Sequence, residues 1–122
     1  MYEIAIEDTF DAAHCLRDYN GACSRLHGHT YHVSVAFRFK SIDTASGLTL
    51  DFREAKSVLR SVLDYLDHQY INDLPEFLEQ NPSAEAIARL IFDGVKCRVP
   101  QTYSVSVRET PTSCATYFED DE

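Results

Sequence analysis

The sequence lacks a long apolar run and lacks the pattern of a secretion signal. No segment approaches the length of a transmembrane helix. The first eight residues are acidic where a signal peptide would be basic, and no apolar core region follows them. The four cysteines are irregularly spaced without a C-x-x-C pair. We therefore expect free thiols, a cytoplasmic location and no membrane partner.

Basic residues are scarce. The chain has 11 Lys and Arg against 20 Asp and Glu, which gives a formal net charge of −9. This balance argues against nucleic acid as a partner, since phosphates need a basic surface, and against an anionic membrane surface. It leaves room for a small anionic substrate, because a few local cations or a helix N-terminus can hold a phosphate.

Internal repeats and low-complexity linkers are also absent from the 122 residues. This length fits one domain, and an apolar fraction of 44% is enough for a packed core. We expect a single domain over residues 1–122.

Two long segments alternate between apolar and polar residues, as half-buried strands do. In the first, residues 2–14, one face is mostly apolar and ends at His14. In the second, residues 27–39, one face begins with His27 and His29 and continues with Tyr31 and apolar residues. The first predicted apolar face therefore ends at one histidine, and the second begins with two.

The second half of the chain predicts two helices and two further strands. Asp51 is the expected N-cap of an amphipathic helix that runs to about Leu66, with Phe52 among its core residues. Ser83 caps a second helix that ends before Pro100. Strands are expected over 103–109 and 114–118. The order ββααββ predicts an α+β fold, a four-stranded antiparallel sheet with two helices on one face.

Three histidines have the spacing of a metal site. Side chains two apart in a strand point the same way, so His27 and His29 can offer two imidazoles to one ion. His14 ends the other strand and can supply a third. Three neutral imidazoles leave one position of a tetrahedral zinc open, which is the catalytic arrangement. His32 has the opposite parity and should point away from this site.

Cys23 differs from the other three cysteines because it lies in a turn-like segment beside these histidines. A neighbouring cation or metal would make its thiol a usable base or nucleophile. Alternatively, Cys23 is a fourth ligand and closes the zinc as a structural site. The remaining three are expected to behave as small apolar residues: Cys15, Cys97 and Cys114.

Two further acidic positions are candidates for function. Glu109 has the parity of the apolar face of its strand, where a carboxylate is costly unless it is paired. It either reaches solvent at the strand end or anchors a ligand with two N–H groups on one edge. Asp67 and His68 can form a pair in which the carboxylate fixes the imidazole tautomer. The other interpretation is a histidine stabilised by the helix dipole.

Six motifs, in order along nearly the whole chain, resemble the 6-pyruvoyl-tetrahydropterin synthase family, and most closely its bacterial 6-carboxy-tetrahydropterin synthase branch. The motifs are Phe10-Asp11-Ala12-Ala13-His14, Cys23-Ser24-Arg25-Leu26-His27-Gly28-His29, Gly47-Leu48-Thr49-Leu50-Asp51-Phe52, Leu66-Asp67-His68, Asn81-Pro82-Ser83-Ala84-Glu85 and Arg108-Glu109-Thr110.

The resemblance implies roles for particular residues. It implies that His14, His27 and His29 are zinc ligands and that Cys23 is the catalytic base. Asp67 and His68 would be the proton-relay partners of that thiol. Glu109 would be the pterin anchor. Gln69 stands where close relatives commonly have a second histidine, but it follows the catalytic position.

The resemblance also implies a fold, an assembly and a reaction. The fold would be the tunnelling fold, assembled as a homohexamer of two trimers with active sites between subunits. The reaction would convert 7,8-dihydroneopterin triphosphate and water to 6-carboxy-5,6,7,8-tetrahydropterin, acetaldehyde and triphosphate, in queuosine or other 7-deazaguanine biosynthesis. Two alternatives remain open: triphosphate elimination alone, to a pyruvoyl pterin, and a zinc-stabilised binding protein without turnover.

Overall fold

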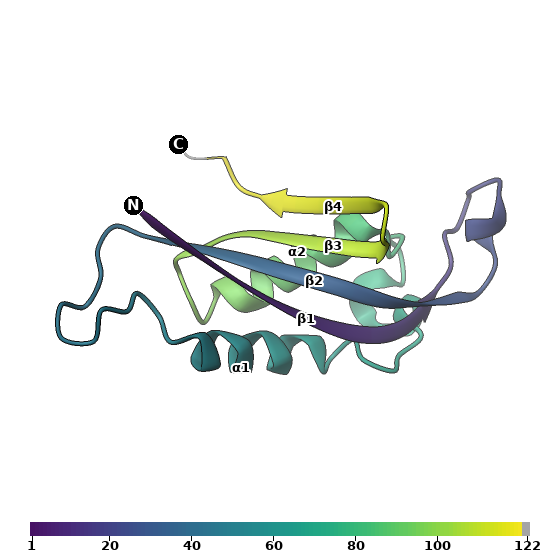
Figure 1. The fold of residues 1–122 in the computed structure, drawn as a ribbon. Coiled ribbons are helices and arrows are strands. Elements are labelled where there is room, and N and C mark those ends of the chain that lie inside the picture. Colours follow the sequence, from purple (N-terminus) through teal and green to yellow (C-terminus); the bar gives the residue numbers. More distant parts are fainter. Residues whose placement is uncertain (121–122) are drawn as a thin grey trace.

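The four predicted strands form one antiparallel sheet in chain order. The computed structural model describes residues 1–120. The strands are β1 (Tyr2–His14), β2 (His27–Phe39), β3 (Thr102–Thr110) and β4 (Ser113–Phe118), and each pairs with the next (Figure 1). The order ββααββ and the antiparallel sheet are confirmed.

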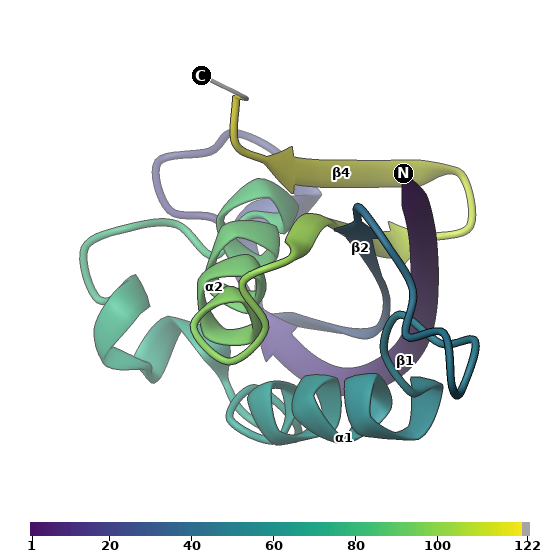
Figure 2. The same cartoon turned by 90° about the vertical axis from the view of Figure 1, so that its left-hand side faces the viewer.

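Both long helices lie on the same side of this sheet (Figure 2). They are α1 (Phe52–Leu63) and α2 (Ala84–Lys96). The predicted caps are present. The Asp51 carboxylate accepts a hydrogen bond from the backbone N–H of Arg53 at 2.8 Å, and the Ser83 hydroxyl accepts one from Ala86 at 3.2 Å. Each satisfies one of the otherwise unpaired N–H groups of a first helical turn.

Two details of the first helix were predicted wrongly. The helix ends at Leu63 instead of about Leu66, although Leu66 is fully buried in the turns that follow. Phe52 was expected in the core, but it is 53% exposed. Helical spacing fixes the direction of a side chain, but it does not say whether a neighbour lies beside that turn.

The prediction that Cys15, Cys97 and Cys114 behave as small apolar residues is also wrong in part. Cys97 and Cys114 are exposed, and Cys15 is half-buried. A lone cysteine has no periodic pattern around it, so its exposure depends on which elements pack nearby.

The core lies between the sheet and the two helices. β1 and β2 pair without interruption from Tyr2 opposite Phe39 to His14 opposite His27. Their inner faces bury Ile6, Phe10, Tyr31, Val33, Val35 and Phe37 against α1, α2 and neighbouring turns. The continuous pairing carries the alternation of the strands to the end of the sheet, where the histidines lie.

Three short 3-10 turns lie between these elements: η1 (Ala22–Ser24), η2 (Ile71–Asp73) and η3 (Pro75–Phe77). The β1–β2 loop, residues 15–26, contains η1 and projects beyond the end of the sheet (Figure 1). Within residues 1–120, neither long helix combines the length and the apolar character that crossing a membrane would require.

Candidate metal centre and active site

The three predicted histidines come together at one end of β1 and β2. The strand register places His14 opposite His27 and Ala12 opposite His29, so all three rings project from the same face. Their ring centroids are 4.6 to 5.3 Å apart. One ring nitrogen from each lies within 4.8 Å of the other two, so the three can hold a metal ion. His32 is exposed on the opposite face, as predicted.

Backbone carbonyl groups set the orientation of two of these rings. Nδ1 of His14 lies 2.7 Å from the carbonyl oxygen of Pro82, and Nδ1 of His27 lies 2.7 Å from that of Arg25. A carbonyl oxygen only accepts, so Nδ1 carries the hydrogen in both rings. Nε2 is therefore the nitrogen of each ring that can offer a lone pair, and a second ring nitrogen held in this way is what orients histidine metal ligands in proteins.

Two buried ring nitrogens of the described cluster lack a hydrogen-bond partner. Within the described residues, Nε2 of His14 and Nε2 of His29 are buried and make no hydrogen bond. Burial, the largest effect, lowers the pKa of His14, and His27 and His29 act in the same direction, whereas Pro82 and Glu109 oppose it. A neutral, buried imidazole with an unpaired lone pair suits a metal ion, so the donor set fits one.

Glu109 points inward, as its parity predicted. Its two carboxylate oxygens lie 3.8 Å from Nε2 of His14 and 3.8 Å from Nε2 of His29, and its side chain is 25% exposed. The carboxylate is thus next to the histidines and still open to a ligand from solvent. Beside it, the fully buried hydroxyl of Tyr31 has no hydrogen-bond partner within residues 1–120.

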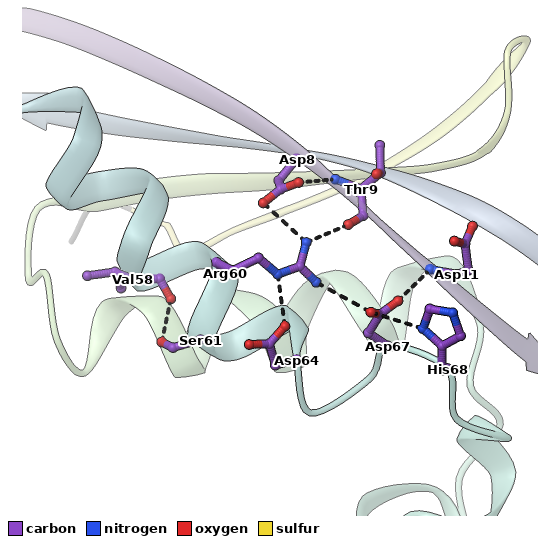
Figure 3. Close-up of polar contacts among 9 residues, drawn as sticks. All are labelled: Asp8, Thr9, Asp11, Val58, Arg60, Ser61, Asp64, Asp67 and His68. Carbon is purple, nitrogen blue, oxygen red and sulfur yellow. Dashed lines mark hydrogen bonds and ion pairs between the residues drawn. The ribbon is translucent and has the colours of Figure 1, made fainter.

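Asp67 and His68 form the predicted pair, at the edge of β1. Asp67 Oδ2 lies 3.0 Å from Nδ1 of His68, and Asp67 Oδ1 accepts a hydrogen bond from the backbone N–H of Asp11 (Figure 3). The N–H of His68 donates to the carbonyl oxygen of Asp11 at 2.6 Å. His68 has a φ of +58°, a left-handed conformation that is unusual for histidine. Its side chain is 78% exposed, and within residues 1–120 its Nε2 makes no hydrogen bond.

Arg60 connects this pair to α1 and β1. Its guanidinium group contacts the carboxylates of Asp8, Asp64 and Asp67 and donates to the carbonyl oxygen of Thr9 (Figure 3). The hydrogen bond from Asp11 lowers the pKa of Asp67 below its ordinary value, and His68 and Arg60 add to this effect. Asp67 is therefore an ionised carboxylate that accepts from Nδ1 of His68.

Cys23 does not join either group. It lies half-buried in η1, and within the described residues its thiol makes no hydrogen bond. Its backbone carbonyl accepts from Leu16 at 2.7 Å. A single chain therefore assembles the histidine cluster with Glu109, and separately the Asp67–His68 pair.

Sequence patterns gave no role to the carbonyl groups of Pro82 and Arg25. A carbonyl group is present at every residue, so only the folded chain selects which one a histidine contacts. The only sequence feature that pointed to this contact was the motif that contains Asn81 and Pro82, and that motif was noted only as part of the family resemblance.

Comparison with known proteins decides the family. The model of the family described as 6-pyruvoyl tetrahydropterin synthase matches residues 3–120. The chain belongs to this family.

Three curated bacterial relatives carry the name 6-carboxy-5,6,7,8-tetrahydropterin synthase. The Synechocystis protein is 40% identical, with 97% of this chain and 94% of the relative covered. The Bacillus subtilis protein is 34% identical, with coverages of 95% and 84%, and the Haemophilus influenzae protein is 33% identical, with coverages of 98% and 100%.

Solved structures agree on the fold. The 6-pyruvoyl tetrahydropterin synthase of Caenorhabditis elegans superposes with a TM-score of 0.86 at 28% identity, and 98% of each chain is covered. The fold is therefore the tunnelling fold that the sequence motifs implied.

Proposed function

We propose that this chain is a zinc-dependent lyase. It converts 7,8-dihydroneopterin triphosphate and water to 6-carboxy-5,6,7,8-tetrahydropterin, acetaldehyde and triphosphate, in queuosine or other 7-deazaguanine biosynthesis. The observation that carries the proposal is the convergence of His14, His27 and His29 beside the Glu109 carboxylate. The names of the three bacterial relatives support the 6-carboxy product.

Zinc is the proposed ion because three neutral imidazoles suit it and leave a coordination position for substrate. When bound, zinc supplies Lewis-acid polarisation of the hydroxyl groups of the substrate side chain. The protein's contribution is to hold the three Nε2 atoms in place. The Pro82 and Arg25 carbonyl groups do this for His14 and His27.

The remaining roles follow from the chemistry of each side chain. The Cys23 thiolate removes a proton from the substrate side chain, and the Asp67–His68 pair transfers a proton on the other side. Because Asp67 holds Nδ1 of His68, Nε2 is the exchanging atom. The Glu109 carboxylate accepts two N–H groups from the pyrimidinone edge of the pterin and fixes the ring relative to the metal.

We propose that the site is completed in a homohexamer, a dimer of trimers. Within the described residues, Cys23 belongs neither to the histidine cluster nor to the group that contains Asp67 and His68, and this supports the assembly, because a neighbouring chain can supply the missing half. Pairing the strand edges of β1 and β4 with neighbours would also protect them from aggregation.

Incubating the zinc-loaded protein with 7,8-dihydroneopterin triphosphate tests the reaction. Acetaldehyde together with 6-carboxy-5,6,7,8-tetrahydropterin is the expected result. A pyruvoyl pterin without acetaldehyde would identify the alternative reaction, triphosphate elimination alone. The name of the Caenorhabditis elegans relative, a 6-pyruvoyl tetrahydropterin synthase, is the observation that favours this alternative. Unchanged substrate in the presence of bound zinc would mean a binding protein without turnover.

A further inference from the structure

Two asparagine side chains hold the start of the β1–β2 loop as an adjacent strand would. The Asn72 amide accepts from the backbone N–H of Cys15 at 2.9 Å and donates to its carbonyl oxygen at 3.0 Å. The Asn81 amide makes the same two bonds with Arg17, at 2.8 and 2.9 Å. A primary amide offers one acceptor and two donors, which matches the N–H and C=O of one residue.

The Arg17 side chain strengthens this attachment. Its guanidinium group donates to the carbonyl oxygens of Gln80 and Asn72, each at 3.2 Å. Asn72 is only 4% exposed, so its bonds are shielded from competing water. The loop is thus fixed at alternate residues by segments more than 50 residues away.

Leu16, which lies between the two anchored residues Cys15 and Arg17, connects them to Cys23. The N–H of Leu16 donates to the carbonyl oxygen of Cys23 at 2.7 Å. The neighbour of Asn81 reaches the metal centre, since the Pro82 carbonyl oxygen accepts from Nδ1 of His14. Asn81 and Pro82 therefore contact the Cys23 loop and a histidine of the cluster from adjacent positions.

We propose that Asn81, together with Asn72, is a positioning residue that fixes the loop bearing Cys23 relative to the histidine cluster. This inference rests on the proposed role of Cys23 as the base. The two asparagines touch neither the metal nor the substrate. They act through Arg17, Cys15 and the Leu16–Cys23 bond, so that the thiol has one position relative to the bound substrate side chain.

The test compares Asn81→Ala with Asn20→Ala. Asn20 lies in the same loop, is exposed, and makes no side-chain hydrogen bond within residues 1–120. In the zinc-loaded protein, Asn81→Ala should lower kcat by roughly 10- to 100-fold, because small misplacements of a reacting group have effects of that order. KM and zinc content should stay near those of Asn20→Ala, because Glu109 and the histidines are untouched.

A second measurement follows the loop without turnover. Hydrogen exchange at the Leu16 amide should be about tenfold faster in Asn81→Ala, since the lost bonds hold the loop closed. Site-resolved alkylation by iodoacetamide should show a changed rate at Cys23 and an unchanged rate at exposed Cys97. If Asn81→Ala fails to fold, Arg17→Met replaces it, because it removes only the two guanidinium contacts.

The outcomes separate the two proposals. A kcat for Asn81→Ala or Arg17→Met within twofold of Asn20→Ala, with faster Leu16 exchange, would overturn the positioning role. Unchanged Leu16 exchange and Cys23 alkylation would overturn the attachment itself. Full turnover in Cys23→Ala, with the Leu16 and alkylation effects of Asn81→Ala intact, would instead reject Cys23 as the base.

Discussion

Nδ1 of His14 donates a hydrogen bond to the carbonyl oxygen of Pro82 at 2.7 Å, and within residues 1–120 the buried Nε2 of the same ring makes no hydrogen bond. The bond fixes both the tautomer and the direction of the ring. It connects the end of β1 to the residue just before the N-cap of α2, 68 positions along the chain. The geometry of the histidine cluster therefore depends on the packing of α2 against the sheet.

Replacing His14 tests the metal site. His14→Ala should lose most of the bound zinc, because the remaining two imidazoles hold the ion weakly. His32→Ala is the matched control, since His32 is a histidine of the same sheet on the opposite face. Elemental analysis after dialysis measures both. Equal zinc content in the two variants would contradict the assignment of His14.

Replacing Cys23 distinguishes a base from a ligand. Cys23→Ala should keep the fold and the zinc but lose turnover by at least about 10²-fold, as expected for removal of a positioned acid or base. Cys97→Ala, which removes an exposed thiol far along the chain, should have normal activity. Loss of zinc and of folded structure in Cys23→Ala would indicate a closed structural site instead.

Replacing Glu109 tests ring capture. Glu109→Gln keeps the shape of the side chain but places a donor where the pterin needs an acceptor. The mismatch should cost roughly 2–4 kcal/mol of substrate binding, seen as a raised KM. Zinc content should not change. A lost zinc ion would make Glu109 a ligand, and an unchanged KM with zinc intact would mean that the ring is held elsewhere.

The lowered pKa of Asp67 predicts a pH dependence of stability. A carboxyl group whose pKa is lower in the folded than in the unfolded chain stabilises the fold above its ordinary value of about 3.9. This contribution is lost as pH falls through the lower, folded value. Asp67→Asn should therefore be less stable than the unsubstituted chain at pH 7, and the difference should shrink as pH falls below about 3.9.

Denaturant unfolding at several pH values measures this difference. Asp64→Asn is the control, because Asp64 contacts Arg60 but has no hydrogen bond to Asp11 or His68 within the described residues. A stability difference for Asp67→Asn that stays constant from pH 7 to pH 3 would contradict the role of the ionised carboxylate.

The sequence by itself determined the elements and one half of the site. Alternation with a period of two placed His14, His27, His29 and Glu109 on inward faces, and the unbroken pairing of β1 with β2 preserved that parity. Cap residues and helical spacing located both helices. These signals depend on residues close together in the chain, so they can be recognised in the sequence alone.

The tertiary structure decided which distant groups contact the inward-facing side chains, because the alternation of a strand gives only the face on which a side chain lies. Only packing of α2 and the segments before it selects the Pro82 carbonyl for His14 and the Asn72 and Asn81 amides for the Cys23 loop. It also left Phe52 exposed and, within residues 1–120, left Cys23 outside both the histidine cluster and the group that contains Asp67 and His68. These contacts join residues far apart in sequence, and neither period nor spacing encodes which distant groups meet.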